Sequence, residues 1–225
     1  MGDERSEHMP IHAEQDHCPL CRSRHTILYF EDRNRRYRQC LDCLLVFVPR
    51  CFWLSRSEEK ATYDLHQNEP HDEGYRHFLS RLSNPLLAQL PPQQRGLDFG
   101  CGPGPTLSSM LEEHGHRIDL YDPFYFNDPS VFDKKYDFIC ATEVVEHLHD
   151  PDREFTSLFE MLKRGGWLAI MTKLVIDRQA FSRWHYIRDL THICFYSRET
   201  FAYLARRFNA QHTFAADDVI LLQKH

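Results

Sequence analysis

The stretch Leu97-Asp98-Phe99-Gly100-Cys101-Gly102-Pro103-Gly104 decides the fold of this 225-residue chain. A short apolar strand runs into three glycines at alternate positions, and Leu107, Met110 and Leu111 then fall on one helical face. Glycine permits a positive φ and carries no Cβ, so the pattern predicts a parallel strand that ends in a loop whose backbone touches a ligand. The spacing is G-x-G-x-G, which differs from the G-x-G-x-x-G of dinucleotide-binding folds.

Strands and helices alternate regularly after this loop. We expect strands at 97–99, 117–121, 136–141 and 167–172, a short or irregular one at 130–132, and a final antiparallel pair at 211–215 and 219–222. This alternation indicates a parallel sheet with helices on both faces. The chain is therefore predicted to be an α/β protein with a doubly wound, mostly parallel sheet of seven strands and an antiparallel C-terminal hairpin.

Charge and cysteine content narrow the class of protein further. The net charge of −6 argues against binding nucleic acid through overall charge. No apolar run approaches the roughly 20 residues that span a bilayer, and residues 1–17 contain no apolar secretory segment. Eight cysteines without such a segment favour a reducing compartment, so we expect a cytoplasmic protein without a membrane partner.

Two C-x-x-C pairs, Cys18/Cys21 and Cys40/Cys43, are separated by eighteen residues. Each pair forms a tight turn with two sulfurs on one side of a metal, so the spacing predicts one structural zinc ion held by four thiolates. Short strands are expected between and after the pairs, which makes residues 16–50 a zinc ribbon behind a flexible tail at 1–15. Two disulfides, four unrelated thiols, or iron in the same geometry are the alternatives.

The hairpin between the cysteine pairs is basic. Residues 18–50 contain seven arginines and three acidic residues, and Arg33, Arg35, Arg36 and Arg38 flank Tyr37. A basic hairpin with an aromatic residue is suited to contact RNA or a phosphorylated substrate. The alternative, which the composition favours, is a solvated hairpin around a structural metal.

Residues 51–95 are predicted to form a helical linker or lid. Asp72 is suited to cap a helix whose apolar face carries Tyr75, Phe78, Leu79 and Leu82. Pro85 and the pair Pro91-Pro92 are expected to break this helix before the sheet begins.

Two further stretches are expected to meet the glycine loop where the parallel strands end. Asp122 follows the second strand, eighteen residues after Gly104, where its carboxylate can accept both hydroxyls of a ribose. The segment Ala141-Thr142-Glu143-Val144-Val145-Glu146-His147-Leu148 follows the strand at 136–141. Together with the glycine loop and Leu162-Lys163-Arg164-Gly165-Gly166, these stretches resemble the class I S-adenosylmethionine-dependent methyltransferases over residues 96–172.

The resemblance implies roles for individual residues of a methyltransferase domain at 96–225. Gly100, Gly102 and Gly104 would line the methionine part of S-adenosylmethionine, and Asp98 would orient the loop or the amino group. The remaining implied contacts are Asp122 to the ribose, Pro123 and Phe124 beside the adenine, Thr142 and Glu143 at the methionyl end, and Tyr63, His66, Asn68 and Tyr75 in a lid. Alternatively, Asp98 binds only local amides and Asp122 only opens the Asp-Pro turn.

Methyl transfer from a sulfonium is an in-line displacement whose leaving group needs no proton, so a base is required only where the acceptor must be deprotonated. The candidates for that role are His147, His185, Tyr186 and His192, the last three in a segment where this family often binds substrate. Fifteen histidines are scattered along the chain, so most of them are surface or core residues.

The sequence therefore predicts an enzyme that transfers a methyl group from S-adenosylmethionine to a small molecule, releasing S-adenosylhomocysteine. One alternative is an RNA methyltransferase that docks ribosomal or transfer RNA on the arginine hairpin. The other two are a non-catalytic protein that keeps the cofactor site and a nicotinamide-dependent oxidoreductase, which the glycine spacing disfavours. The acceptor and the oligomeric state leave no signal in the sequence.

Overall fold

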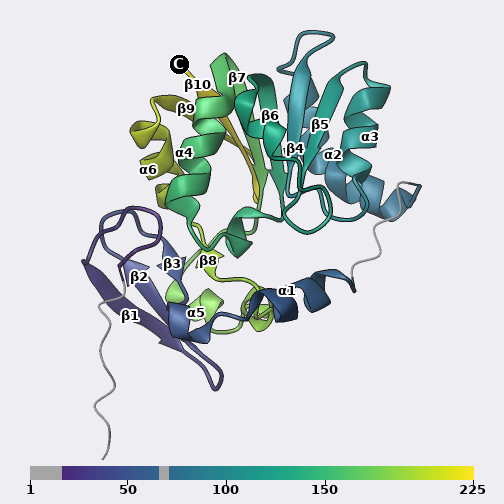
Figure 1. Cartoon of the computed structure of the whole chain (residues 1–225). Coiled ribbons are helices and arrows are strands. Elements are labelled where there is room, and N and C mark those ends of the chain that lie inside the picture. Colours follow the sequence, from purple (N-terminus) through teal and green to yellow (C-terminus); the bar gives the residue numbers. More distant parts are fainter. Residues whose placement is uncertain (1–16, 66–70) are drawn as a thin grey trace, which may run out of the picture.

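The computed structural model describes residues 17–65 and 71–225 and shows a large α/β unit above a smaller module (Figure 1). The tail expected at 1–15 and the lid candidates His66 and Asn68 lie outside the described residues. Within the described ranges, no helix combines the length and the apolar character that a bilayer crossing requires.

The large sheet has the order β5-β4-β6-β7-β10-β9. Its strands are β4 (Arg95–Phe99), β5 (Arg117–Tyr121), β6 (Tyr136–Thr142), β7 (Leu162–Met171), β9 (Ala210–Ala216) and β10 (Val219–Lys224). The first four in spatial order are parallel, and β10 is antiparallel to both β7 and β9. The expected doubly wound, mostly parallel sheet with an antiparallel C-terminal hairpin is confirmed.

The expected count of seven strands is wrong for the part of the chain that the structure describes, where the sheet has six. The candidate strand at 130–132 lies instead in a 3-10 helix, η2 (Pro129–Asp133). Asp128 accepts a hydrogen bond from the Ser130 amide and Pro129 opens the turn, and both features favour a helical start over an extended chain.

Alternate residues of the central strands pack on opposite helical layers. Phe138 of β6 and Met171 of β7 belong to the cluster formed with α2 (Glu73–Leu87) and α3 (Thr106–Glu113). Ile139 and Ile170, one residue away, belong to the cluster formed with α4 (Pro151–Met161) and α6 (Arg198–Arg207). Figure 1 shows these two helix pairs on the two sides of the sheet. The continuous apolar character of the strands follows from this double burial.

The helix starts follow the capping residues. Asp72 accepts from the Tyr75 amide at the start of α2, and Asp150 accepts from the Arg153 amide at the start of α4. The expectation that Pro85 ends its helix is wrong, because α2 continues to Leu87. Pro85 lies in the last turn, where it removes one backbone hydrogen bond, while the fully buried Leu82 and Leu86 keep this end packed on the sheet.

The smaller module contains the expected strands, here β1 (Thr26–Glu31), β2 (Arg36–Cys40) and β3 (Val46–Phe47). A fourth strand, β8 (Cys194–Phe195), comes from the C-terminal half and pairs antiparallel with β3. The ring of Tyr37 lies 5.1 Å from that of Phe181 and 5.8 Å from that of Phe195. The module therefore shares its core with the segment that follows β7, which contains α5 (Arg178–Phe181) and η4 (His185–Arg188).

Candidate functional site

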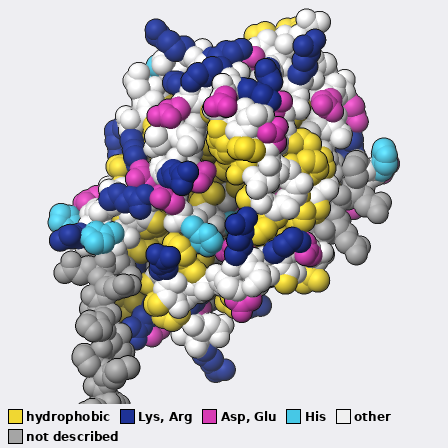
Figure 2. All heavy atoms as spheres, viewed as in Figure 1, with side chains coloured by type: hydrophobic (Ala, Val, Ile, Leu, Met, Phe, Trp, Pro, Cys, Tyr) yellow, Lys and Arg dark blue, Asp and Glu magenta, His cyan; other side chains and the backbone are white. Residues whose placement is uncertain are grey.

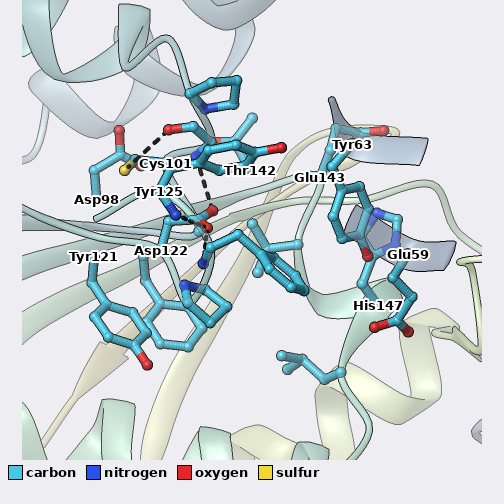
Figure 3. Close-up of a pocket in the computed structure, with 18 of the residues that line it drawn as sticks. Glu59, Tyr63, Asp98, Cys101, Tyr121, Asp122, Tyr125, Thr142, Glu143 and His147 are labelled. Carbon is cyan, nitrogen blue, oxygen red and sulfur yellow. Dashed lines mark hydrogen bonds between the residues drawn. The ribbon is translucent and has the colours of Figure 1, made fainter. Parts of the chain in front are cut away.

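A cavity of about 770 Å³ lies beyond the carboxyl ends of β4, β5 and β6. Two helices that precede the sheet contribute to its wall: α1 (Arg56–Tyr63) supplies Tyr63, and α2 supplies Tyr75. In Figure 3, Asp98, Cys101 and Asp122 lie on one side of the cavity, and Glu59, Tyr63 and His147 on the other. All ten residues predicted to bind the cofactor line this cavity: Tyr75, Asp98, Gly100, Gly102, Gly104, Asp122, Pro123, Phe124, Thr142 and Glu143.

The glycine loop has the conformation that its sequence predicts. Gly100 has φ of +76° and Gly102 has φ of +63°. The Gly100 amide donates to the Tyr121 carbonyl at 2.7 Å, and a Cβ at this position would lie 2.5 Å from a methyl group of Val144. Gly100 is therefore required both by its backbone conformation and by close packing, whereas Gly102 has open space around it.

Two carboxylates flank the loop. Asp98 is almost fully buried and accepts a hydrogen bond from Ser108 Oγ at 2.8 Å. Burial, reinforced by the charge of Asp122, raises the pKa of Asp98 to about 6.

Asp122 closes the turn that follows β5. Its Oδ1 accepts from the amides of Phe124 at 2.8 Å and Tyr125 at 3.2 Å, and its Oδ2 accepts from the Gly102 amide at 3.1 Å. Asp122 therefore organises its own turn, which is the role that the alternative prediction gave it. A carboxylate has about four lone-pair positions, so these three bonds leave capacity for a ligand hydroxyl.

An unusual group of oxygens follows β6. Thr142 Oγ1, Glu143 Oε1 and Glu146 Oε2 are the buried side-chain polar atoms without a hydrogen-bond partner in the described ranges. Glu143 has a positive φ of 53°, and burial together with the charge of Glu146 raises its pKa. A buried polar atom left unpaired costs about 1–3 kcal/mol, so a cluster of them indicates a place where a ligand supplies the missing partners.

Two of the four proposed bases reach the cavity. His147, in η3 (Val145–His147), and His192 both line it, with ring centroids 4.7 Å apart. Burial, and then the neighbouring His147, lower the pKa of His192, which keeps this imidazole neutral at pH 7.

The structure removes His185 and Tyr186 from the candidate site. His185 is exposed outside the cavity, with Nε2 3.1 Å from Lys173 Nζ, because the 3-10 helix η4 turns it toward solvent. Tyr186 is buried beneath the cavity wall, where its hydroxyl donates to Glu146. Burial and the charge of Glu146 raise the pKa of Tyr186 strongly, and the residue does not line the cavity.

Sequence reasoning missed Glu59 and gave no role to Glu146. Glu59 is buried on α1, lines the cavity and binds His149 Nε2 at 2.8 Å. Its signal was the i, i+4 spacing to Tyr63, which places both side chains on one helical face. Glu146 is fully buried. The sequence of residues 141–148 alone does not show whether this carboxylate is buried or solvated, so it gave no signal.

The four paired cysteines converge as their spacing predicts. Cys18 Sγ lies 3.4 Å from Cys43 Sγ, Cys21 Sγ lies 3.4 Å from Cys40 Sγ, and all four sulfurs lie within 4.8 Å of one another. Sulfurs bound at about 2.3 Å to a central zinc lie about 3.8 Å apart, so the cluster fits a tetrathiolate metal site. The separations are too long for disulfide bonds, which span about 2.05 Å.

One of the four arginines of the basic hairpin is buried, whereas Arg33 and Arg36 are exposed. Arg35 is buried, and its guanidinium donates to the carbonyls of Ile187, Asp189 and Leu190. Its prediction as an RNA contact is wrong because the guanidinium is buried and satisfies these three carbonyls. Arg36 pairs with Glu31, and Arg38 binds Thr26. On the face shown in Figure 2, Lys and Arg side chains are interspersed with Asp and Glu.

Comparisons with known proteins agree with this geometry. A relative, the biotin biosynthesis bifunctional protein BioCD of Bordetella avium, is 29% identical over 139 residues, which are 52% of this chain and 29% of that protein. The chain thus spans less than a third of the length of this relative.

Two solved structures are among those similar to the chain. One is the 1,6-didemethyltoxoflavin-N1-methyltransferase of Burkholderia thailandensis with bound 1,6-didemethyltoxoflavin and S-adenosylhomocysteine, 16% identical, covering 82% of this chain and 97% of that one at a TM-score of 0.48. Another is a putative methyltransferase of Bacillus halodurans, 15% identical, covering 60% and 70% at a TM-score of 0.45.

A family model described as a methyltransferase domain matches residues 70–213, more than half of the chain. The matched range contains the glycine loop, Asp122 and the segment after β6 that together form the cavity. The chain therefore belongs to the methyltransferase domain family.

Proposed function

We propose that this protein transfers a methyl group from S-adenosylmethionine to a small-molecule acceptor. The observation that carries the proposal is the convergence of the positive-φ glycine loop, Asp98, Asp122 and the segment after β6 on one cavity at the carboxyl edge of the parallel strands. In doubly wound folds this edge is where ligands bind. The family assignment favours S-adenosylmethionine over a nicotinamide cofactor.

In this proposal each wall of the cavity binds one part of the cofactor. Asp122 accepts a ribose hydroxyl, with Pro123 and Phe124 beside the adenine. Gly100, Gly102 and Gly104 face the methionine part, and Asp98 faces its ammonium. Thr142 and Glu143 contribute their unpaired oxygens at the methionyl end. Tyr63 and Tyr75 cover the site from the helices before the sheet.

The acceptor is proposed to bind at the side of the cavity formed by Tyr63, His147 and His192. The Tyr63 ring lies 5.4 Å from that of His147 and 5.7 Å from that of Phe124, so aromatic surface connects this side to the proposed adenine site. The cavity volume of about 770 Å³ lies within the range of small-molecule sites. These residues act by orienting the two reactants and excluding water around the sulfonium.

The buried Arg35 and the interspersed surface charges favour a small molecule over RNA. The zinc ribbon and cytoplasmic residence remain predictions, supported by the four free thiols that converge in the small module.

Calorimetric titration with S-adenosylhomocysteine tests the cofactor assignment. We expect binding, and a loss of about 1–3 kcal/mol in Asp122→Ala, because ligand hydroxyls lose a charged partner. Asp128→Ala is the matched control, since Asp128 caps η2 outside the cavity. Heat with NAD and none with S-adenosylhomocysteine would contradict the proposal. Binding without methyl transfer to any of a panel of small molecules would instead support the non-catalytic alternative.

A further inference from the structure

Three potential metal ligands converge at the proposed acceptor side of the cavity. Glu146, His147 and His192 each offer one ligand atom, and these atoms lie within 4.8 Å of one another. His147 and His192 line the cavity, and Glu146 lies directly behind them, fully buried. This cluster is separate from the four cysteines, which lie in the small module.

Both imidazoles are oriented by their Nδ1 atoms. His147 Nδ1 lies 3.1 Å from the Thr191 carbonyl, and His192 Nδ1 lies 2.8 Å from the Tyr186 carbonyl. Because a carbonyl oxygen can only accept, each Nδ1 carries the proton and the lone pair of the neutral ring is on Nε2. This arrangement, with one ring nitrogen donating to a carbonyl, is the one that protein metal sites use to orient histidine ligands.

The carboxylate is oriented in the same way. The Tyr186 hydroxyl donates to Glu146 Oε1, while Glu146 Oε2 is buried without a hydrogen-bond partner. The backbone fixes the two segments against each other, since the Ile193 amide donates to the Glu146 carbonyl at 2.8 Å and the Tyr196 hydroxyl donates to the Val145 carbonyl at 3.0 Å. A fully buried carboxylate with one oxygen unpaired lacks a positive partner.

We propose that Glu146, His147 and His192 form a binding site for a divalent cation at the acceptor side of the cavity. Two imidazoles and one carboxylate suit Mn²⁺, Fe²⁺, Co²⁺ or Zn²⁺, and three protein ligands leave coordination positions open toward the cavity. The cation also gives Glu146 Oε2 the positive partner that it lacks.

The consequence for chemistry rests on the proposed function. A bound cation supplies Lewis acidity that lowers the pKa of an acceptor hydroxyl. The hydroxyl proton passes to solvent, the oxygen forms a bond to the methyl carbon, and the C–S bond breaks with its electron pair remaining on sulfur. His147 and His192 then serve as ligands and not as bases. The acceptor class is a small molecule with a hydroxyl group able to ligate the cation.

Titration with Mn²⁺, followed by the electron paramagnetic resonance signal of the free ion, tests the site in the full chain. Mn²⁺ is the probe because thiolates select Zn²⁺ over it, so the four-cysteine cluster does not compete. We expect one Mn²⁺ per chain, with at least about tenfold weaker binding in His147→Ala and in His192→Ala. His185→Ala is the matched control, because His185 lies in the same segment but outside the cavity. We expect this variant to bind Mn²⁺ as tightly as the wild type.

Glu146→Gln keeps the shape of the side chain and removes its charge, so it supplies a second test if an alanine variant fails to fold. Loss of Mn²⁺ binding in the folded glutamine variant supports the site. Absence of binding at millimolar Mn²⁺, or equal binding by the wild type and the His147 and His192 variants, overturns it. Calorimetry with S-adenosylhomocysteine is run in parallel, so failure of the cation site is distinguishable from failure of the cofactor assignment.

Discussion

The buried carboxylate of Asp98 makes cofactor affinity depend on pH in a way that can be calculated. Burial raises the pKa of Asp98 from 3.8 to about 6, so near pH 5 most free protein molecules carry the protonated acid. If Asp98 faces the ammonium of the cofactor, as we propose, binding favours the ionised carboxylate. Binding then releases a proton at low pH, and affinity rises as the pH increases through 6.

The magnitude follows from linkage. If the ammonium of the bound cofactor lowers the pKa of Asp98 to about 4 in the complex, the affinity for the cofactor increases about tenfold between pH 5 and pH 7.5. Most of this change falls below pH 6.5. The ligand ammonium stays protonated through most of this range, so the change reports on the protein.

Calorimetric titration of S-adenosylhomocysteine at pH 5, 6, 7 and 7.5 measures this change. Repeating the titration at pH 5.5 in two buffers of different ionisation enthalpy counts the protons released. Asp98→Asn should bind more weakly at pH 7.5 and lose most of the pH dependence, whereas Glu143→Gln controls for another cavity carboxyl whose pKa is raised. Affinity that is flat from pH 5 to pH 7.5, or an equal slope in Asp98→Asn, would refute the reasoning.

Four further predictions concern stability, cofactor binding and metal binding. Asp98→Asn should raise the free energy of unfolding by up to about 3 kcal/mol at pH 8, measured with urea, and by little below pH 4, because a raised folded pKa destabilises the folded protein only above the unfolded value. Gly100→Ala should abolish S-adenosylhomocysteine binding in calorimetry, whereas Gly115→Ala, also at positive φ but with open space around it, should cost only about 1 kcal/mol of stability. Arg35→Met should lower the urea unfolding free energy by about 3–5 kcal/mol, since three carbonyls lose a buried charged donor, and Arg36→Met by less than about 1 kcal/mol. Elemental analysis should find about one zinc or iron per chain for the four cysteines, beside the cation at Glu146, His147 and His192, and removal of the cysteine-bound ion by a chelator should increase hydrogen exchange both in β1–β3 and in β8, because β8 completes the same sheet.

The large sheet was predictable because its signals are local. Apolar runs of strand length, a helix cap such as Asp150 and the glycine loop each act through neighbouring residues. The convergence of the ten cofactor candidates on one cavity followed from the general rule that ligands bind at the carboxyl ends of parallel strands. The prediction of a strand at 130–132 failed because Asp128-Pro129 starts a helical turn, and the segment is too short to hold both a helical turn and a strand.

The contacts between the small module and the rest of the chain were not predictable. β3 and β8 have two residues each and lie far apart in the sequence, so no periodicity marks their pairing. Arg35 has the same local environment in the sequence as its neighbours Arg33 and Arg36, yet it is the one that bonds to a segment about 150 residues away. The exposure of His185 and the burial of His192 likewise depend on η4, which has no strong sequence signal.

These long-range contacts give the small module a structural role at the candidate site. Arg35 binds the carbonyls of residues 187, 189 and 190, and the next turn of chain supplies His192 to the cavity. On the other side of His192, β8 pairs with β3. The small module therefore holds the chain both before and after His192. Since β3 follows the Cys40/Cys43 pair directly, a metal bound by the four cysteines would stabilise one wall of the cavity from a distance. The cysteine module is thus better explained as a support for the acceptor side of the site than as an arm that reaches for RNA.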